Sequence, residues 1–254
     1  MKKTALILVV LIGFVTSAIA QDVVISKEET KVNSKTLVHR QENKFDIGVE
    51  CAPSLIFMRG NDMIKNYHKP TIGFSAGIFF QYNFPKIFSL RTNIAYERKG
   101  SVLKDMKDIQ ITTVDQPSEF VGRATIHTNY DYLTFPILVR ATFGKKVNFF
   151  VNVGPYFGCL IKQTTVVKIK ESKISQTYEE TSYFKRFDIG IATGLGLSVP
   201  IKTNFAFSFE VRNNLGLYNV SKIPVANNGT IKTNSTNFLL GFTYKLGQRT
   251  SIRK

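Results

Sequence analysis

The sequence has few cysteines and histidines and, after its N-terminal segment, no long apolar run. It contains two cysteines, Cys51 and Cys159, and three histidines, His39, His68 and His127. Two cysteines do not make a disulfide framework, and the histidines lack the spacing of metal ligands. Beyond the N-terminal segment, no stretch approaches the ~18 uninterrupted apolar residues of a membrane helix. We therefore expect no metal, no cofactor and no helical membrane domain.

The N-terminal segment has the three parts of a secretory signal peptide. Two lysines follow Met1, an apolar run extends over 5–15, and small residues over 17–20 precede Gln21. This pattern predicts a signal peptide over 1–20 with cleavage after Ala20. No cysteine follows the cut, so a lipoprotein anchor is not expected. Residues 21–44 are polar and without periodicity, which predicts a flexible periplasmic segment.

The segment from Phe45 to Phe57 alternates between apolar residues and small or polar ones. Its odd positions are all apolar, whereas its even positions begin Asp46, Gly48 and Glu50. Successive side chains of a strand point to opposite faces of the sheet. The alternation therefore predicts a strand with one apolar face and one polar face.

This alternation recurs about eight times. The predicted strands are 45–57, 71–84, 87–99, 130–143, 147–160, 184–199, 204–217 and 236–246. Each is at least as long as the ~9–11 residues with which a tilted strand crosses a bilayer. The connections are long at 58–70, 100–129, 161–183 and 218–235, and tight after the second, fourth and sixth strands.

Regular alternation of long and short connections is typical of an even-stranded membrane barrel. We therefore predict an all-β fold over 45–247, an eight-stranded antiparallel transmembrane β-barrel of the outer-membrane type. It would have short periplasmic turns, four long extracellular loops and a basic C-terminal tail over 248–254. We expect a monomer in the outer membrane of a Gram-negative bacterium.

The polar faces of these strands would line the lumen. The charged residues on them are Asp46, Glu50, Arg91, Glu97, Arg140, Asp188, Glu210, Arg212 and Lys245. An eight-stranded barrel has an interior just wide enough for side chains to fill, and buried charges of mixed sign should pair there. We expect a structural polar network, including a contact between Asp46 and Lys245. The two cysteines would point outward from opposite sides and stay unpaired.

The net charge of +16 raises the question of a charged partner. The lysines and arginines are scattered rather than grouped in a nucleic-acid-binding motif, so no nucleic acid is expected. The excess fits a basic surface facing outer-membrane lipids, including lipopolysaccharide phosphates. The excess of positive charge fits equally well a role in keeping the polar loops soluble.

Catalytic signals are sparse. The run Gly194-Leu195-Gly196-Leu197 lacks the Lys-Ser/Thr of a phosphate-binding loop and opens no helix. Small lipid-modifying barrels of the outer membrane use a histidine with a hydroxyl or carboxylate near the outer rim. In this sequence His127 stands beside Thr128 and has acidic residues in the neighbouring loops. No nucleophile-elbow motif supports this reading, so a solvated histidine is the default. The lysines and threonines of 161–183 suit either partner recognition or a solvated hairpin.

The strands also resemble the PorT-type outer-membrane β-barrel proteins of Bacteroidetes. The similarity rests on Tyr132–Leu138, Val153–Gly158, Phe187–Gly190 with the glycines through Gly196, and Phe242–Gly247. It covers roughly 45–247 and implies the barrel fold. Through the family's namesake it also implies an association with type IX secretion. The basic tail departs from the aromatic end that such barrels often carry.

We accordingly predict a non-enzymatic protein with a structural, adhesive or secretion-accessory role. It would act through its extracellular loops on a protein partner in secretion or at the cell surface. The competing classes are a small outer-membrane lipid-modifying enzyme and a narrow pore. For a non-enzymatic protein of this kind we expect no catalytic, cofactor-binding or metal site.

Overall fold

The computed structural model describes residues 44–85, 87–109, 122–144, 146–169, 175–202, 204–225 and 228–246. The predicted signal peptide and basic tail, and all but the last residue of the predicted periplasmic segment, lie outside these ranges. Among the described residues, no helix is long and apolar enough to cross a membrane.

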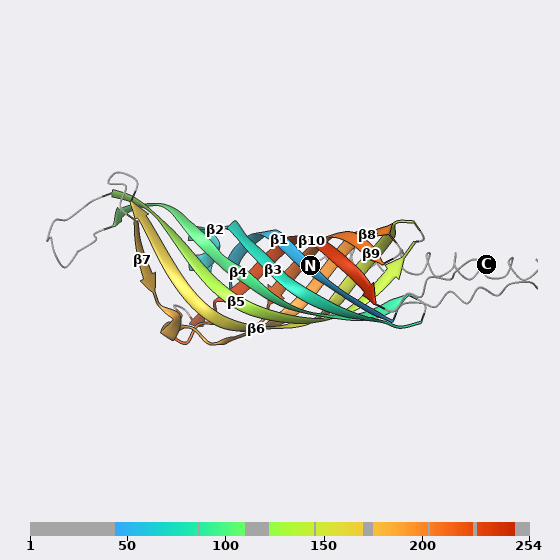
Figure 1. The fold of residues 1–254 in the computed structure, drawn as a ribbon. Coiled ribbons are helices and arrows are strands. Elements are labelled where there is room, and N and C mark those ends of the chain that lie inside the picture. Colours follow the sequence, from blue (N-terminus) through green and yellow to red (C-terminus); the bar gives the residue numbers. More distant parts are fainter. Residues whose placement is uncertain are drawn as a thin grey trace, which may run out of the picture. The chain divides into compact units, whose positions relative to one another are not determined.

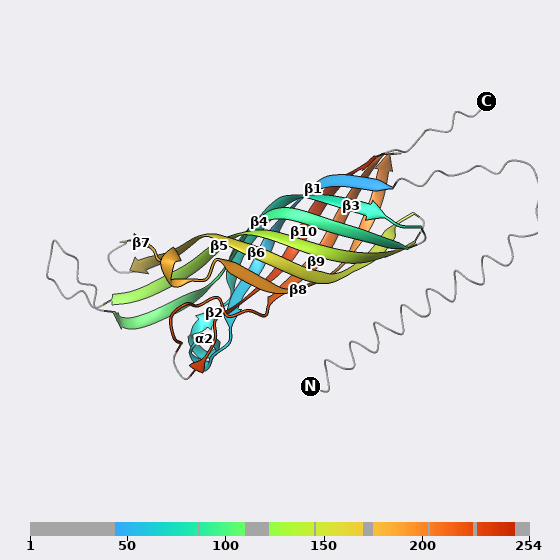
Figure 2. The same cartoon turned by 90° about the horizontal axis from the view of Figure 1, so that it is seen from below.

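Eight antiparallel strands form a closed ring (Figures 1 and 2). They are β1 (Phe45–Arg59), β3 (Thr71–Asn83), β4 (Phe88–Ile109), β5 (Gly122–Phe143), β6 (Asn148–Ile169), β8 (Phe187–Lys202), β9 (Phe205–Gly216) and β10 (Lys232–Leu246). Each strand pairs with its neighbours in the chain, and β10 pairs with β1. The predicted eight-stranded barrel is confirmed.

The connections at one end are tight and those at the other end are long. Short turns join β3 to β4, β5 to β6 and β8 to β9, as the sequence predicts. At the other end, Asn61 accepts a hydrogen bond from the Ile64 N–H at 2.7 Å and caps the short helix α2 (Asp62–Tyr67). The 3-10 helix η2 (Thr181–Tyr183) precedes β8.

The long connections contain more strand than the sequence predicts. β4, β5 and β6 each run for 22 residues, so much of the predicted loops 100–129 and 161–183 is sheet. Two short strands, β2 (His68–Lys69) and β7 (Ser175–Glu179), pair with β4 and β6 respectively. This extracellular sheet reaches beyond the rest of the barrel (Figures 1 and 2). Above the membrane neither face has to be apolar, so the alternation stops although the backbone ladder continues.

The apolar sides of the strands point outward and the polar sides inward. Ile78 and Leu195 are 54% and 61% exposed, whereas Glu97 and Asp188 are fully buried. Cys51 is exposed and Cys159 partly exposed, and both are free thiols on strands four places apart in the ring. The prediction of unpaired, outward-facing cysteines is confirmed.

Candidate functional site

The lumen holds most of the charged residues that the sequence places there. The buried ones are Asp46, Glu50, Arg91, Glu97, Arg140, Asp188, Glu210 and Arg212. Lys245 is half-buried and stands opposite Asp46 in the register of β1 and β10. Asp46 accepts hydrogen bonds from the side-chain amides of Gln81 at 3.3 Å and Asn83 at 2.9 Å. Amide donors thus reach this carboxylate from β3.

A group of acids and arginines crosses the middle of the barrel. Arg212 Nη1 lies 3.0 Å from Glu50 Oε1, and its Nε lies 2.7 Å from Glu210 Oε1. Arg91 donates to Glu50 from another wall, and Arg140 Nη2 lies 3.3 Å from Glu210 Oε2. We call these five residues the arginine network. It links β1, β4, β5 and β9, because each carboxylate receives donors from more than one strand.

A second buried group lies around Lys99. Its ammonium Nζ donates to Asp188 Oδ2 at 2.9 Å and to the Tyr156 hydroxyl at 3.1 Å. Thr233 donates to the same Asp188 oxygen at 2.6 Å. Glu97, 3.9 Å from Lys99, accepts from the Asn214 and Asn237 side chains at 3.0 Å. This lysine is fully buried with its charge balanced by two carboxylates.

Lys99 is the principal interior residue that the sequence reading did not include. It falls at the end of the third predicted strand, where a lysine is ordinarily solvated. It nevertheless shares the parity of Arg91 and Glu97, both of which point into the lumen. Strand parity within the predicted strand 87–99 was therefore a sufficient signal for Lys99.

Each of three inward-facing aromatic rings has a glycine opposite it on the neighbouring strand and a cation over its face. Phe79 stands opposite Gly48, and Tyr156 and Phe150 stand opposite glycines of β8. The three cations over the rings are Arg91 on Phe79 at 3.5 Å, Lys99 on Tyr156 at 4.2 Å and Arg140 on Phe150 at 3.8 Å from the ring centroids. Each glycine makes room for a ring that is then held by a cation–π contact.

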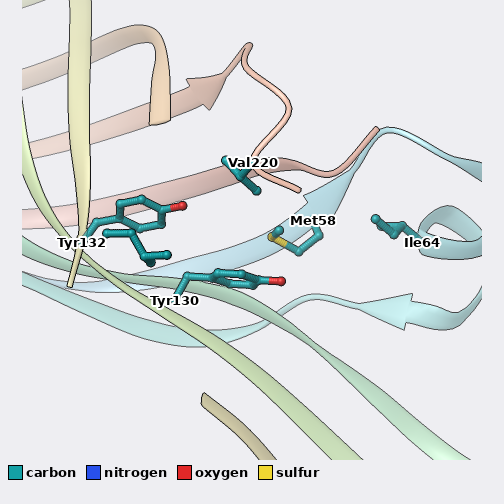
Figure 3. Packing of buried hydrophobic residues seen from close by; sticks show 6 residues of the cluster. Met58, Ile64, Tyr130, Tyr132 and Val220 are labelled. Atoms are coloured by element: carbon teal, nitrogen blue, oxygen red, sulfur yellow. The ribbon is translucent and has the colours of Figure 1, made fainter. Parts of the chain in front are cut away.

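An apolar cluster of buried residues joins the extracellular ends of the strands to the segments that follow them (Figure 3). Its buried members are Met58, Ile64, Tyr130, Tyr132, Leu160 and Val220. Ile64 comes from α2 and Val220 from the connection between β9 and β10, so these segments fold inward (Figure 3). Phe184 packs on Tyr130 edge to face, with ring centroids 4.9 Å apart. We call this cluster the plug.

The interior is balanced in charge as well as filled. In the two central groups Glu50, Glu97, Asp188 and Glu210 face Arg91, Lys99, Arg140 and Arg212, four charges of each sign, all buried. Asp46 lies nearer the end of β1, with half-buried Lys245 opposite it. Unpaired buried charge is costly, so such pairing is the arrangement that a closed interior requires. With the plug above it, this lumen has the features of a packed core rather than of a water-filled channel.

The described histidines lie above the membrane-spanning part of the strands. His127 is half-buried on β5, and its pKa lies below the usual value because burial and the charges of Lys168 and Lys104 disfavour protonation. The described charged neighbours that act on His127 are therefore lysines, and the acidic residues of the predicted loop 100–129 lie outside the described side chains. Among the described residues, no group of histidines, cysteines and carboxylates could hold a metal ion.

A different histidine carries a hydroxyl partner. His68 Nδ1 lies 2.7 Å from Ser101 Oγ, and His68 lines a cavity of about 450 Å³ beside α2 together with Arg59 and Lys65. Burial lowers the pKa of His68. Ser101 is fully buried and does not line this cavity, so its hydroxyl is not presented to a substrate there.

A closed antiparallel barrel with an apolar outer surface and a filled, charge-balanced interior defines an outer-membrane barrel protein. Residues 20–222 match the family model described as outer membrane protein beta-barrel domain. The chain belongs to this family, and it is located in the outer membrane of Gram-negative bacteria.

Several solved structures of outer-membrane barrels are similar to this chain, each at low sequence identity. Neisserial surface protein A is 14% identical, with 80% of this chain and 97% of that chain covered and a TM-score of 0.41. Ail of Yersinia pestis is 13% identical, covering 79% and 98%, with a TM-score of 0.39. OprG of Pseudomonas aeruginosa is 10% identical, covering 80% and 96%, with a TM-score of 0.39. No curated protein matches the chain in sequence.

Proposed function

We propose that this protein is a non-enzymatic outer-membrane barrel that acts through its extracellular sheet. Its role would be adhesive or structural, or accessory to protein secretion as the PorT-type resemblance implies, with a protein partner at the cell surface. The observation that carries the proposal is the contrast between the two parts of the barrel. The lumen is packed with charged side chains that pair with one another, whereas β4, β5 and β6 extend far past it and carry polar side chains.

The extension can be removed without cutting the barrel. Leu103 and Ile126 are cross-strand partners, so an Asn-Gly turn between them would replace residues 104–125 with a two-residue hairpin. We expect this variant to assemble and to keep its heat-modifiable migration in gels. We also expect cell adhesion or protein secretion by the producing bacterium to fall to the level of a deletion strain.

The same two proteins test the pore reading. Both the intact and the shortened barrel should be silent in planar bilayers, because the arginine network and the plug fill the lumen. Stable conductance steps from the intact protein would contradict a role confined to the surface. So would unchanged adhesion and unchanged secretion in a strain whose shortened barrel is assembled.

The second candidate is a lipid-modifying enzyme, and the pair His68 and Ser101 favours it. The hydrogen bond and the neighbouring cavity are the features that such chemistry uses, although a fully buried serine argues against it. We expect His68→Ala and Ser101→Ala to leave the lipid A profile unchanged by mass spectrometry. Loss of the same lipid species in both variants, with Lys65→Ala as a neutral control in the same cavity, would establish the enzyme instead.

A further inference from the structure

The outward face of the extracellular sheet continues the lipid-facing surface of the barrel. Every second residue of β5, from Ile137 through Leu133 to His127, lies on this side. In β4 the same face runs to Lys104, and the pairing of β4 with β5 keeps one register up to Leu103 and Ile126. Side chains at the top of the sheet therefore face the region that surrounds the barrel, not its axis.

A row of charged residues marks the upper edge of the apolar belt. Arg98, Asp131 and Lys162 are cross-strand neighbours on β4, β5 and β6. They follow directly above Leu133, the last apolar residue of its row on β5. Asp131 accepts two hydrogen bonds from Arg98, at 2.7 and 3.0 Å, and Lys162 pairs with Glu179 at 2.8 Å. Both cations of this row have carboxylate partners within the protein.

Two lysines lie six residues further along β4 and β6, and His127 lies four residues past Asp131 on β5. Lys104 and Lys168 are exposed, and Lys168 is the cross-strand partner of Thr125. His127 lies on the same face and is close enough to both lysines for their charges to lower its pKa. Among the described side chains, neither lysine has an ion-pair partner. The two lysines carry the positive charge and His127 offers ring nitrogens beside them; we call the three residues the upper cationic group.

The height of this group above the membrane limits what it can contact. Six residues at about 3.3 Å each place the two lysines about 20 Å along the strands from the charged row. With strands tilted by about 35–45°, the rise along the membrane normal is about 15 Å. Lipid phosphates next to the hydrocarbon lie near the charged row. A partner at the upper group must project further into the extracellular space.

We propose that Lys104, His127 and Lys168 bind the anionic core saccharide of an outer-leaflet glycolipid, through its phosphate groups. The surface faces the lipids that surround the barrel, lies at the height of their saccharides and has positive charge that the described side chains do not neutralise. Lys69, also exposed and on β2 opposite Val102, extends the same surface toward α2. Lysines bind phosphate as flexible point charges, which suits a heterogeneous saccharide.

The test measures binding of three fluorescent glycolipids to the full-length barrel in neutral detergent micelles at 50 mM NaCl. The probes are a lipopolysaccharide with a phosphorylated inner core, the same molecule after dephosphorylation of the core, and lipid A without core. The variant is Lys104→Gln with Lys168→Gln. The control is Lys44→Gln with Lys146→Gln, which removes the same charge from two exposed residues at the periplasmic end.

We expect the Lys104 and Lys168 variant to bind the phosphorylated probe about thirtyfold more weakly, roughly fivefold for each lysine. The control should bind it as the native protein does, and neither pair should alter binding of the other two probes. An equal loss in variant and control would overturn the proposal. The proposal would also be overturned if the Lys104 and Lys168 variant lost affinity for lipid A without core and not for the phosphorylated probe. The same holds if these two lysines affected binding of a soluble polyanion such as heparin but of none of the glycolipids.

Discussion

Replacing Arg212 by leucine is expected to destabilise the barrel by about 3–5 kcal/mol, as removal of one partner from a buried ion group does. Arg212 is the residue that joins Glu50 of β1 to Glu210 of its own strand. Without it, two carboxylates face each other across the lumen with fewer donors. The chain has no tryptophan, so unfolding is best followed by far-UV circular dichroism against urea in lipid vesicles.

The control for this prediction is Arg98→Leu. Arg98 makes an ion pair of similar geometry with Asp131, but its side chain is 35% exposed at the barrel rim. Water screens that pair, and the expected loss is less than about 1 kcal/mol. Adding Glu210→Gln to Arg212→Leu should recover part of the stability by removing one carboxylate charge. Equal losses at Arg212 and Arg98, or no recovery, would show that the network does not hold the barrel together.

Replacing Gly190 by alanine is expected to cost about 1–3 kcal/mol, the usual penalty for overpacking a filled interior. A Cβ at this position would lie 2.2 Å from the carbonyl oxygen of Leu215 and 2.5 Å from the ring of Tyr156. Backbone cannot move aside cheaply, and displacing Tyr156 disturbs its hydrogen bonds to Lys99 and Asp188. The urea midpoint of the variant in vesicles measures the effect.

Gly241→Ala is the matched control, since it is the same change in another barrel strand. Its Cβ would meet the Ser208 hydroxyl at 2.5 Å and nothing else closer than 3.8 Å. A hydroxyl can rotate away, so we expect a loss below about 1 kcal/mol. If the two variants unfold at the same urea concentration, the glycine of β8 does not serve to seat the ring of Tyr156.

Strand parity explains why so much of this molecule could be predicted. A slip of one residue would turn every lumen side chain toward lipid, so the alternation fixes both the faces and the register. The ring order, the turns and the buried position of residues such as Glu97 and Arg140 follow from it. The choice of ion-pair partners does not, because it depends on which inward side chains meet across the lumen, as Arg212 of β9 meets Glu50 of β1.

The parts that could not be predicted lie where the membrane no longer imposes a pattern. Val220 and Ile64 stand in segments without periodicity, and only the inward fold of those segments brings them to Tyr130 and Tyr132. The strand extensions have polar residues on both faces, so 100–129 resembled a loop, and 161–183 suited a recognition loop and a solvated hairpin equally well. The pairing of His68 with Ser101 joins two extracellular segments 33 positions apart, which no local motif indicates.

The closure of β10 on β1 has a consequence for how the barrel folds. These strands are the first and last of the ring, so their ladder is the pairing with the largest sequence separation, and such contacts form late. The hydrogen bond from Asn237 to Glu97 spans 140 positions, and that from Arg212 to Glu50 spans 162. Because β10 and β1 supply one end of each, these bonds form in their native geometry only when the seam closes in the correct register. A displaced seam would leave Glu50 without Arg212 and Glu97 without Asn237 in a low-dielectric interior, so these bonds favour the correct register at the last step of assembly.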